Sequence, residues 1–232
     1  MFSVLKVSGS ALKSDQLYDN IARLYDAGNI TPIIYGWGSA LTEKLNSSGL
    51  GTEIHESGVR ITKAKDLPLL EEIAMEHAGM ISTKLEEKGI RSRLLYKIIK
   101  AQMKPLEGVS EKHYTGEYVQ ADTRRIMDCT KEGIIPLIPP LGYNGSLLNI
   151  NADNVATGLV LDLKPDSYIL CTNSGGVVRD GKIMDTLSIA NDNGNYISHG
   201  MRLKINELRK VAGKSEIIIA SPDTFQGTYV VA

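Results

Sequence analysis

The chain has 232 residues, which suits one large α/β domain or two small ones and allows a sizeable core. Its hydrophobic content of 42% and charged content of 23% are ordinary for a globular protein, and its formal net charge of −1 gives no support for nucleic-acid binding. No apolar run approaches the length of a membrane span, and the strand pattern that begins at Phe2 leaves no room for a signal peptide. Cys129 and Cys171 lie far apart without metal-ligand spacing. We therefore expect a cytoplasmic protein with no nucleic-acid or membrane partner.

Two strand–turn–helix units open the chain. A strand over residues 2–7 ends in the turn 8–10, and a strand over 31–35 ends in the turn 36–38, which leads into a helix from about 40 to 47. Strands that alternate with helices predict a parallel sheet covered by helices on both faces.

The two turns carry the first chemistry through Gly9, Gly36 and Gly38. Glycine lets the backbone approach a ligand closely, and N–H groups beside a helix start favour phosphate. Neither turn continues into the Gly-Lys-Ser/Thr of a P-loop. Lys6 lies on the strand before the first turn, where a charge is costly without an anionic partner. The alternative is an edge-strand lysine at the surface.

Residues 51–62 predict a hairpin, and Thr62 is a candidate cap for a helix over 63–89. Arg60 presents a fork of donors that suits a substrate carboxylate, although a solvated hairpin arginine fits the pattern equally well. His77 falls on the apolar face of the helix, which favours a packing role over a ligand role.

Residues 84–104 are rich in lysine and arginine. Such a run indicates a solvated face, and an alternative is a docking surface for an acidic partner. Residues 105–122 predict a second hairpin or loop excursion, and a helix follows from about 122 to 131.

A polar cluster, Asn149, Asn151 and Asp153, lies between a buried strand with its loop and a helix over 154–163. If the segment is extended, alternation points all three side chains the same way. Polar groups between a buried strand and a helix start lie where open α/β sheets place ligands. A helix N-cap explains one of the three, and a functional site explains the set.

The chain closes with a strand over 167–172 that ends in a third glycine-rich turn, a polar loop over 191–200 and a helix over 201–211. Two strands, 216–220 and 228–231, come last. Lys204 is predicted in the first turn of that helix, where the helix dipole disfavours a cation unless an anion faces it.

Six motifs in this order resemble the amino acid kinase family, and most closely its acetylglutamate kinase branch. They lie at residues 6–10, 35–38, 58–62, 148–153, 170–177 and 197–204, and the similarity covers nearly the whole chain. The Asn-x-Asn-Ala-Asp run at 149–153 and the Gly-Met-x-x-Lys run at 200–204 are the most specific.

The resemblance implies a three-layer αβα sandwich on a mainly parallel sheet, forming a single domain over 1–232. About 1–145 would hold the substrate and about 146–232 would hold ATP. The implied reaction moves the γ-phosphoryl group of ATP, with Mg²⁺ on its phosphates, onto the side-chain carboxylate of an N-acylated acidic amino acid. N-acetyl-L-glutamate, an intermediate of arginine biosynthesis, is the implied substrate. Family members commonly pair through the N-terminal half, so the resemblance also implies a homodimer.

The same resemblance implies a role for each matching residue. Lys6 would stabilise the transferring phosphoryl group, Lys204 would act on the nucleotide side, and Asp153 would hold and orient both catalytic lysines. Substrate contacts would come from Gly36, Trp37, Gly38, Arg60 and Asn149. Nucleotide contacts would come from Gly9, Thr172, Asn173, Gly176 and Lys204. No residue is assigned as a metal ligand.

The chain departs from the family pattern at Ser8, Trp37, Asn173 and His199, where the family usually has Gly, Gly, Asp and Gly, and at Tyr35, where His is usual. Backbone donors survive such changes, but Trp37 places bulk beside the substrate. The absence of an extra N-terminal helix implies no arginine feedback.

Two alternatives remain open from the sequence. The first is a sister kinase whose aminoadipate or glutamate substrate is attached to a small acidic amino-group carrier protein; the run 38–40 resembles that branch, and the basic segment could meet the carrier. The second is a catalytically inactive, amino-acid-binding regulatory domain, against which the retention of Lys6, Asp153 and Lys204 argues.

Overall fold

The computed structural model describes residues 1–190 and 199–232 and is built around one eight-stranded sheet. Its strands run in the order β14-β16-β15-β11-β1-β2-β8-β5. Their bounds are β1 (Ser3–Val7), β2 (Ile33–Tyr35), β5 (Ser92–Leu94), β8 (Ile135–Ile138), β11 (Ser167–Cys171), β14 (Thr186–Ser188), β15 (Glu216–Ala220) and β16 (Gly227–Val231). All neighbouring pairs are parallel except β15 with β16, which confirms the predicted mainly parallel sheet.

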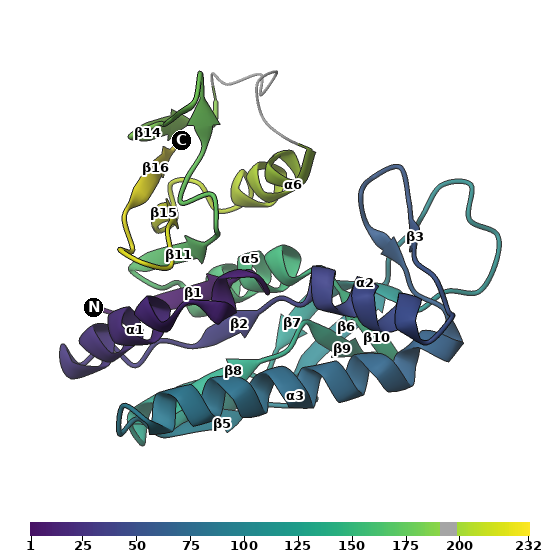
Figure 1. Ribbon diagram of the computed structural model, residues 1–232, viewed down its shortest axis with the longest axis horizontal. Coiled ribbons are helices and arrows are strands. Elements are labelled where there is room, and N and C mark those ends of the chain that lie inside the picture. The colour runs from purple at the N-terminus through teal and green to yellow at the C-terminus, as the bar shows by residue number, and fades with distance from the viewer. Residues whose placement is uncertain (191–198) are drawn as a thin grey trace.

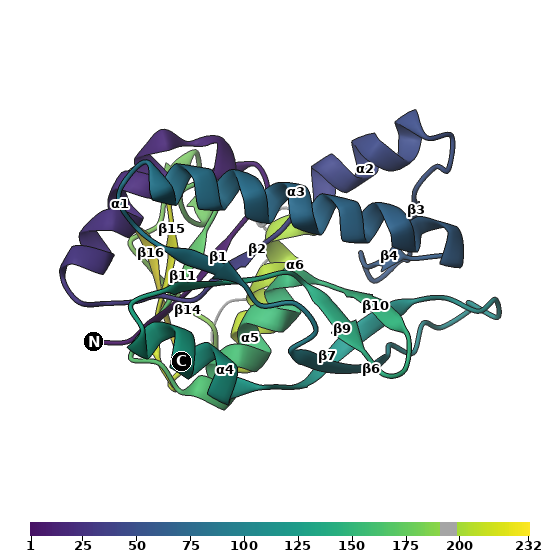
Figure 2. The same ribbon diagram turned by 90° about the horizontal axis from the view of Figure 1, so that it is seen from below.

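Helices cover the sheet on both sides, as Figures 1 and 2 show. Their bounds are α1 (Asp15–Asp26), α2 (Gly38–Ser47), α3 (Leu67–Glu86), α4 (Thr123–Lys131), α5 (Ala152–Leu163) and α6 (His199–Leu208). Apolar side chains of α1, α2 and α3 share one core with the sheet, and those of α4, α5 and α6 share a second core on the other side. This is the expected three-layer arrangement. None of the described helices is long and apolar enough to cross a membrane.

The alternation of side chains along β1 decides which core each residue enters. Leu5 and Val7 join the core beneath α1, α2 and α3, while Val4 joins the core beneath α4, α5 and α6. Lys6 lies between Leu5 and Val7 and therefore points to the side of α5 and α6. The side of the sheet on which Lys6 lies therefore follows from the alternation of side chains along β1.

Smaller sheets carry the connections between the layers. A closed four-stranded sheet contains β6 (Ile99–Met103), β7 (Thr115–Ala121), β9 (Leu141–Tyr143) and β10 (Leu147–Ile150). Two hairpins pair β3 (Glu53–Ile54) with β4 (Arg60–Ile61) and β12 (Val178–Arg179) with β13 (Lys182–Ile183). The predicted lobe boundary near residue 145 lies in the β9–β10 connection. The large sheet continues through both halves of the chain, because β1 pairs with β2 on one side and with β11 on the other.

Three local predictions are wrong. Thr62 does not cap α3, whose N-cap is Asp66; the Thr62 hydroxyl instead accepts a hydrogen bond from Asn149. Residues 149–153 are not one extended segment, because β10 ends at Ile150 and α5 begins at Ala152. Lys204 lies in the second turn of α6, since that helix begins at His199. The helix-dipole argument for an anion beside Lys204 therefore does not hold.

The prediction that His77 has a packing role is confirmed, although its side chain is only half-buried. Its ring lies parallel to that of Tyr35 at a centroid distance of 6.5 Å, and its Nδ1 lies 3.0 Å from the Ile73 carbonyl oxygen. Burial lowers its pKa, so the neutral form is favoured. Most of the polar loop predicted over 191–200 lies outside the described residues.

Candidate active site

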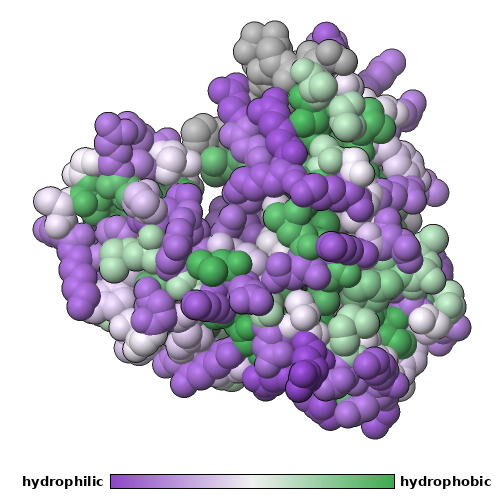
Figure 3. Space-filling view, turned by 180° about the vertical axis from the view of Figure 1, so that it is seen from behind, coloured by the Kyte–Doolittle hydropathy of each residue, from purple (hydrophilic) through white to green (hydrophobic). Residues whose placement is uncertain are grey.

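A polar cavity of about 350 Å³ lies at the carboxyl ends of β1 and β2. Its walls come from the turns after these strands, the first turn of α2, the β3–β4 hairpin, the β10–α5 junction and α6. Figure 3 shows the surface hollowed between the lobe that carries this hairpin and the lobe that carries α6, with mostly hydrophilic residues around the hollow. The lining includes nine predicted site residues: Lys6, Gly9, Gly36, Trp37, Gly38, Arg60, Asn149, Asp153 and Lys204.

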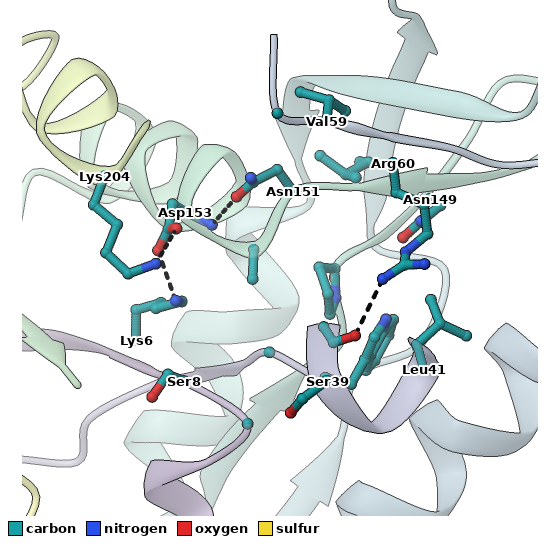
Figure 4. A pocket seen from close by; sticks show the side chains of 18 of the residues that line it. Lys6, Ser8, Ser39, Leu41, Val59, Arg60, Asn149, Asn151, Asp153 and Lys204 are labelled. Atoms are coloured by element: carbon teal, nitrogen blue, oxygen red, sulfur yellow. Dashed lines mark hydrogen bonds and ion pairs between the residues drawn. The ribbon is translucent and has the colours of Figure 1, made fainter. Parts of the chain in front are cut away.

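One carboxylate holds two lysines at one end of the cavity. Asp153 Oδ1 lies 2.6 Å from Lys6 Nζ, and Asp153 Oδ2 lies 3.0 Å from Lys204 Nζ. These residues come from α5, β1 and α6, so three separate elements meet at a single side chain (Figure 4). Lys6 and Asp153 are only 3% and 6% exposed. A buried charge needs this kind of pairing to be tolerated.

The ion pairs keep Asp153 anionic. Burial by itself would raise the pKa of this carboxyl, but the charges and hydrogen bonds of Lys6 and Lys204 outweigh burial and lower the pKa to about 2. The pKa of Lys6 is lowered, because burial and the nearby Lys204 charge oppose its protonation more than Asp153 supports it. Two ammonium groups against one carboxylate leave an excess of positive charge at this end, which suits a polyanionic ligand.

The first two glycine-rich turns pack against each other. The Gly36 N–H donates to the Val7 carbonyl at 2.8 Å, and a Cβ on Gly9 would lie 2.7 Å from the Gly36 carbonyl oxygen. Position 9 therefore requires glycine, because the two turns approach too closely to leave room for a Cβ. Gly38 begins α2, and no side chain caps that helix start. The first N–H groups of α2 thus remain available to an anion in the cavity.

Arg60 lies at the other end of the cavity and is held by neutral oxygen atoms. Its NH1 donates to Thr52 Oγ1 at 2.6 Å, and its NH2 donates to Thr42 Oγ1 at 2.7 Å and to the Gly38 carbonyl at 3.1 Å. Among the described residues, no carboxylate lies within ion-pair distance of this guanidinium, and Figure 4 shows it apart from the lysine pair. Burial lowers its pKa. An unpaired, partly buried guanidinium with donors to spare suits a carboxylate ligand.

The Asn149, Asn151 and Asp153 side chains do line one cavity, although not through strand alternation. Asn149 lies on β10, and its Nδ2 donates to Thr62 Oγ1 at 2.8 Å. Asn151 caps α5, because its Oδ1 accepts from the Asp153 N–H at 2.7 Å. The first turn of α5 then brings Asp153 to the lysines. A strand end, a cap and a helical turn achieve together what alternation was expected to do.

The third glycine-rich turn does not line this cavity. Thr172 is buried at the end of β11, and its Oγ1 lies 2.9 Å from Ser174 Oγ. Gly176 packs against β13 and β16, since a Cβ there would lie 2.6 Å from Ile183 and 2.7 Å from Thr228. Asn173 is exposed. The turn lies at the same sheet edge as Ser8, because Val7 and Cys171 are register partners. Its nucleotide role stays a prediction.

Trp37 intrudes on the cavity less than the sequence predicted. Its side chain is 3% exposed and belongs to the core beneath α2 and α3. Its ring meets that of Tyr35 edge-on, at a centroid distance of 5.9 Å and an angle of 66°. Most of the indole therefore lies in the core, and only a small part of its surface lines the cavity.

The sequence analysis missed the residues that hold the site residues in place. Thr42 and Thr52 orient Arg60, and Thr62 orients Asn149. Each contact joins segments whose relative position depends on the assembled sheet, so no local signal in the sequence could have indicated them. Leu41, Ile54 and Val59 are apolar residues that also line the cavity.

The described residues offer no protein-only metal site, because no cluster of three or more His, Cys, Asp or Glu side chains could hold an ion there. Asp153, the carboxylate of the cavity, is already engaged by two lysines. A magnesium ion would fit here only as part of a nucleotide whose phosphates supply most of its oxygen ligands.

Fold and site together define a class of protein: an α/β protein with a cationic cavity at the carboxyl ends of its parallel strands. The sequence model of the amino acid kinase family matches residues 1–221. The chain belongs to the amino acid kinase family.

Two relatives are named acetylglutamate kinase. The one from Xanthomonas campestris pv. campestris is 27% identical over 227 residues, which are 90% of this chain and 50% of that protein. The one from Streptococcus mutans serotype c is 27% identical over 241 residues, covering 99% of this chain and 98% of that protein. The chain thus spans about half the length of the first relative and nearly all of the second.

Solved structures show the same fold. The crystal structure of smu.665 from Streptococcus mutans UA159 superposes with a TM-score of 0.90 at 25% identity, covering 100% of this chain and 98% of that one. The N-acetylglutamate synthase of Neisseria gonorrhoeae superposes with a TM-score of 0.89 at 19% identity, with 59% of its chain covered. The second match shows the fold alone. Both agree with the α/β architecture predicted from the sequence.

Proposed function

We propose that the chain is an ATP-dependent kinase that phosphorylates the side-chain carboxylate of an N-acylated acidic amino acid, with N-acetyl-L-glutamate as the first candidate. One observation carries this proposal. A single cavity has two lysines on one buried aspartate at one end and, at the other, an arginine with no acidic partner among the described residues. That arrangement suits a ligand with a phosphate chain at one end and a carboxylate at the other. The relatives named acetylglutamate kinase support the choice of acid.

In the proposed reaction, a carboxylate oxygen of the substrate forms a bond to the γ-phosphorus of ATP, and the bond from that phosphorus to the bridging oxygen of ADP breaks. The products are an acyl phosphate and ADP, and no proton transfer is needed because the attacking carboxylate is already ionised. Lys6 and Lys204 neutralise charge on the transferring group, while Asp153 holds both ammonium groups in position. Gly9 and the uncapped start of α2 at Gly38 supply backbone N–H donors, and Arg60 fixes the substrate at the far end.

ATP would carry its Mg²⁺ into the site, and the ion would draw charge from the β- and γ-phosphates. The third glycine-rich turn, with Thr172, Asn173 and Gly176, is proposed to meet the nucleotide from the adjoining sheet edge. In this proposal about 1–145 serve the substrate and about 146–232 serve the nucleotide.

A free small substrate is favoured over a carrier-linked one. In the described part of the chain, most basic residues between 84 and 104 already have partners. The ion pairs are Lys84 with Asp15, Lys88 with Asp19, Arg93 with Glu132, and Lys104 with Glu117. Arg91 donates to the Glu132 carbonyl, and Lys97 lies over the rings of Tyr96 and Tyr143. Because these cations already have partners within the protein, fewer of them are free to meet an acidic carrier.

A homodimer is also proposed. β5 is an edge strand of the large sheet, and Met75 and Met80 of α3 are exposed. An exposed sheet edge beside apolar side chains favours association with a second copy.

The direct test supplies MgATP with N-acetyl-L-glutamate and traps the acyl phosphate with hydroxylamine as a hydroxamate. We expect hydroxamate and ADP to form in equal amounts, with free L-glutamate as a much poorer acceptor. A parallel reaction with glutamate or aminoadipate attached to a carrier protein addresses the alternative substrate. ADP release without hydroxamate from any of these acids would remove the proposal.

A further inference from the structure

Trp37 is the single tryptophan of the chain, and aromatic packing beneath the cavity holds it in position. Its ring meets Tyr35 edge-on, and the Tyr35 hydroxyl donates to the Ala74 carbonyl on α3 at 2.9 Å. Tyr35 in turn lies parallel to the ring of His77. The indole is therefore held by packing, and its orientation does not depend on a bound ligand.

The polar edge of this indole is not used within the protein. Among the described residues, no acceptor is hydrogen-bonded to Trp37 Nε1, and this nitrogen is not one of the fully buried polar atoms that lack a partner. Trp37 lines the cavity although only 3% of its side chain is exposed. The small part that reaches solvent thus includes Nε1, and because Trp37 lines the cavity we infer that its N–H faces the cavity. An indole N–H can only donate, so the ligand atom it meets must be an acceptor.

Asn149 supplies the complementary group. Its Nδ2 is committed to Thr62 Oγ1 at 2.8 Å, which leaves its Oδ1 as an acceptor on the cavity side. The cavity therefore offers one neutral donor, Trp37 Nε1, and one neutral acceptor, Asn149 Oδ1, in addition to the charged fork of Arg60. A secondary amide carries one acceptor and one donor of its own. A free ammonium group carries donors alone and would leave the indole N–H without a partner.

We propose that Trp37 determines the substrate class by donating its indole N–H to the carbonyl oxygen of the substrate's N-acyl group, while Asn149 accepts the amide N–H. This proposal rests on the function proposed above and deepens it. The acyl methyl would then contact the apolar residues of the cavity lining, which include Leu41, Ile54 and Val59.

The test compares N-acetyl-L-glutamate with glutarate, which keeps both carboxylates and lacks the acylamino group. Trp37→Phe keeps an aromatic ring against Tyr35 and removes the N–H. Binding of each acid to wild type and variant is measured by calorimetry, with displacement titration for the weaker ligand. We expect the preference for N-acetyl-L-glutamate over glutarate to fall about 10-fold in the variant, because the acyl oxygen loses its donor.

Tyr35→Phe is the matched control, since it removes a buried hydroxyl from the same aromatic cluster but outside the cavity. Its preference between the two acids should equal that of wild type. If Trp37→Phe weakens both acids equally, or leaves the preference unchanged, Trp37 only packs and the proposal is overturned. Because binding needs no turnover, a protein that binds N-acetyl-L-glutamate but forms no acyl phosphate would refute the proposed kinase function and leave this test intact.

Discussion

The two ends of the cavity hold their charged side chains in different ways. At the end proposed to hold the phosphates (the phosphate end), Lys6 and Lys204 are held and partly neutralised by Asp153, which joins a strand to two helices. At the substrate end, Arg60 is oriented by hydroxyl and carbonyl oxygens and has no acidic neighbour in contact among the described residues. The phosphate end is thus assembled by the fold itself, whereas the substrate end keeps a charge for its ligand. Changes at the first should affect stability and the chemical step, and changes at the second should affect binding.

The largest effect should come from Asp153→Asn. Lys6 is almost fully buried, so removing the carboxylate leaves an uncompensated buried cation close to Lys204. We expect the free energy of unfolding in urea to fall by about 3–5 kcal/mol and phosphoryl transfer to disappear.

The double variant Lys6→Met with Asp153→Asn separates the two consequences. It removes the unpaired, buried ammonium group of Lys6, so part of the lost stability should return while activity stays absent. An Asp153→Asn protein as stable as wild type would show that the ion pairs do not assemble this end of the cavity.

Lys204→Ala should mainly slow the chemical step. Lys204 is more exposed than Lys6, so the fold tolerates its loss, but the transferring phosphoryl group loses one of its two cations. We expect kcat to fall by about 100- to 1000-fold, with a much smaller change in the KM for the acid. Steady-state kinetics with the hydroxamate assay measure both.

Arg60→Lys is the comparison at the other end. It keeps the charge but loses the fork, so KM should rise more than kcat falls. The same kinetic pattern in both variants would contradict the division of roles between the two ends. Unchanged turnover in Lys204→Ala would remove the kinase assignment.

The phosphate end should also respond to acid. The folded-state pKa of Asp153 is lowered from 3.8 to about 2, so its contribution to stability is present above the unfolded pKa and is lost as pH falls from about 4 to about 2. That contribution is about 2 kcal/mol. Urea unfolding at a series of pH values should show this slope in wild type and a shallower slope in Asp153→Asn. Equal slopes would mean that other carboxyl groups account for the acid sensitivity.

The smallest effects should come from alanine substitutions at Gly9 and Gly38. The sequence analysis assigned both glycines the same backbone role, but the two substitutions should differ in their cost to stability. Gly9→Ala places a Cβ against the Gly36 carbonyl oxygen, so the two turns must move apart, at a cost of about 1–3 kcal/mol together with some activity. Gly38→Ala meets no atom within 4 Å and is the matched control. Thermal unfolding and kinetics of both variants measure the contrast. Equal losses in the two would show that crowding at Gly9 is not the cause.

The fold could be predicted well from the sequence because short local patterns indicate where each strand and helix begins and ends. Glycine-rich turns end the first two strands of the large sheet, and the alternation of short apolar strands with amphipathic helices favours one architecture. Resemblance to a family then indicated that Lys6, Asp153 and Lys204 act together, and the structure places them in contact. The residues alone gave weaker grounds, because the helix start assumed for Lys204 was wrong.

What the sequence could not predict is long-range register. Thr62 was expected to cap a helix, yet it orients Asn149, which is 87 positions away in the chain. Thr42 and Thr52 carry no signal of their role, because the partner they share, Arg60, reaches them only after the β3–β4 hairpin folds over α2. The third glycine-rich turn looked like the other two but packs against β13 and β16.

The register of β1 has a consequence for insertions and deletions. Loops that surround the cavity can change length while the strand keeps its pairing, but a shift of one position within β1 would turn every side chain to the opposite layer. The ammonium group of Lys6 would then enter the apolar layer beside Leu17 and Ile21, out of reach of Asp153. The alternation of side chains along the five residues of β1 therefore decides whether Lys6 can meet Asp153.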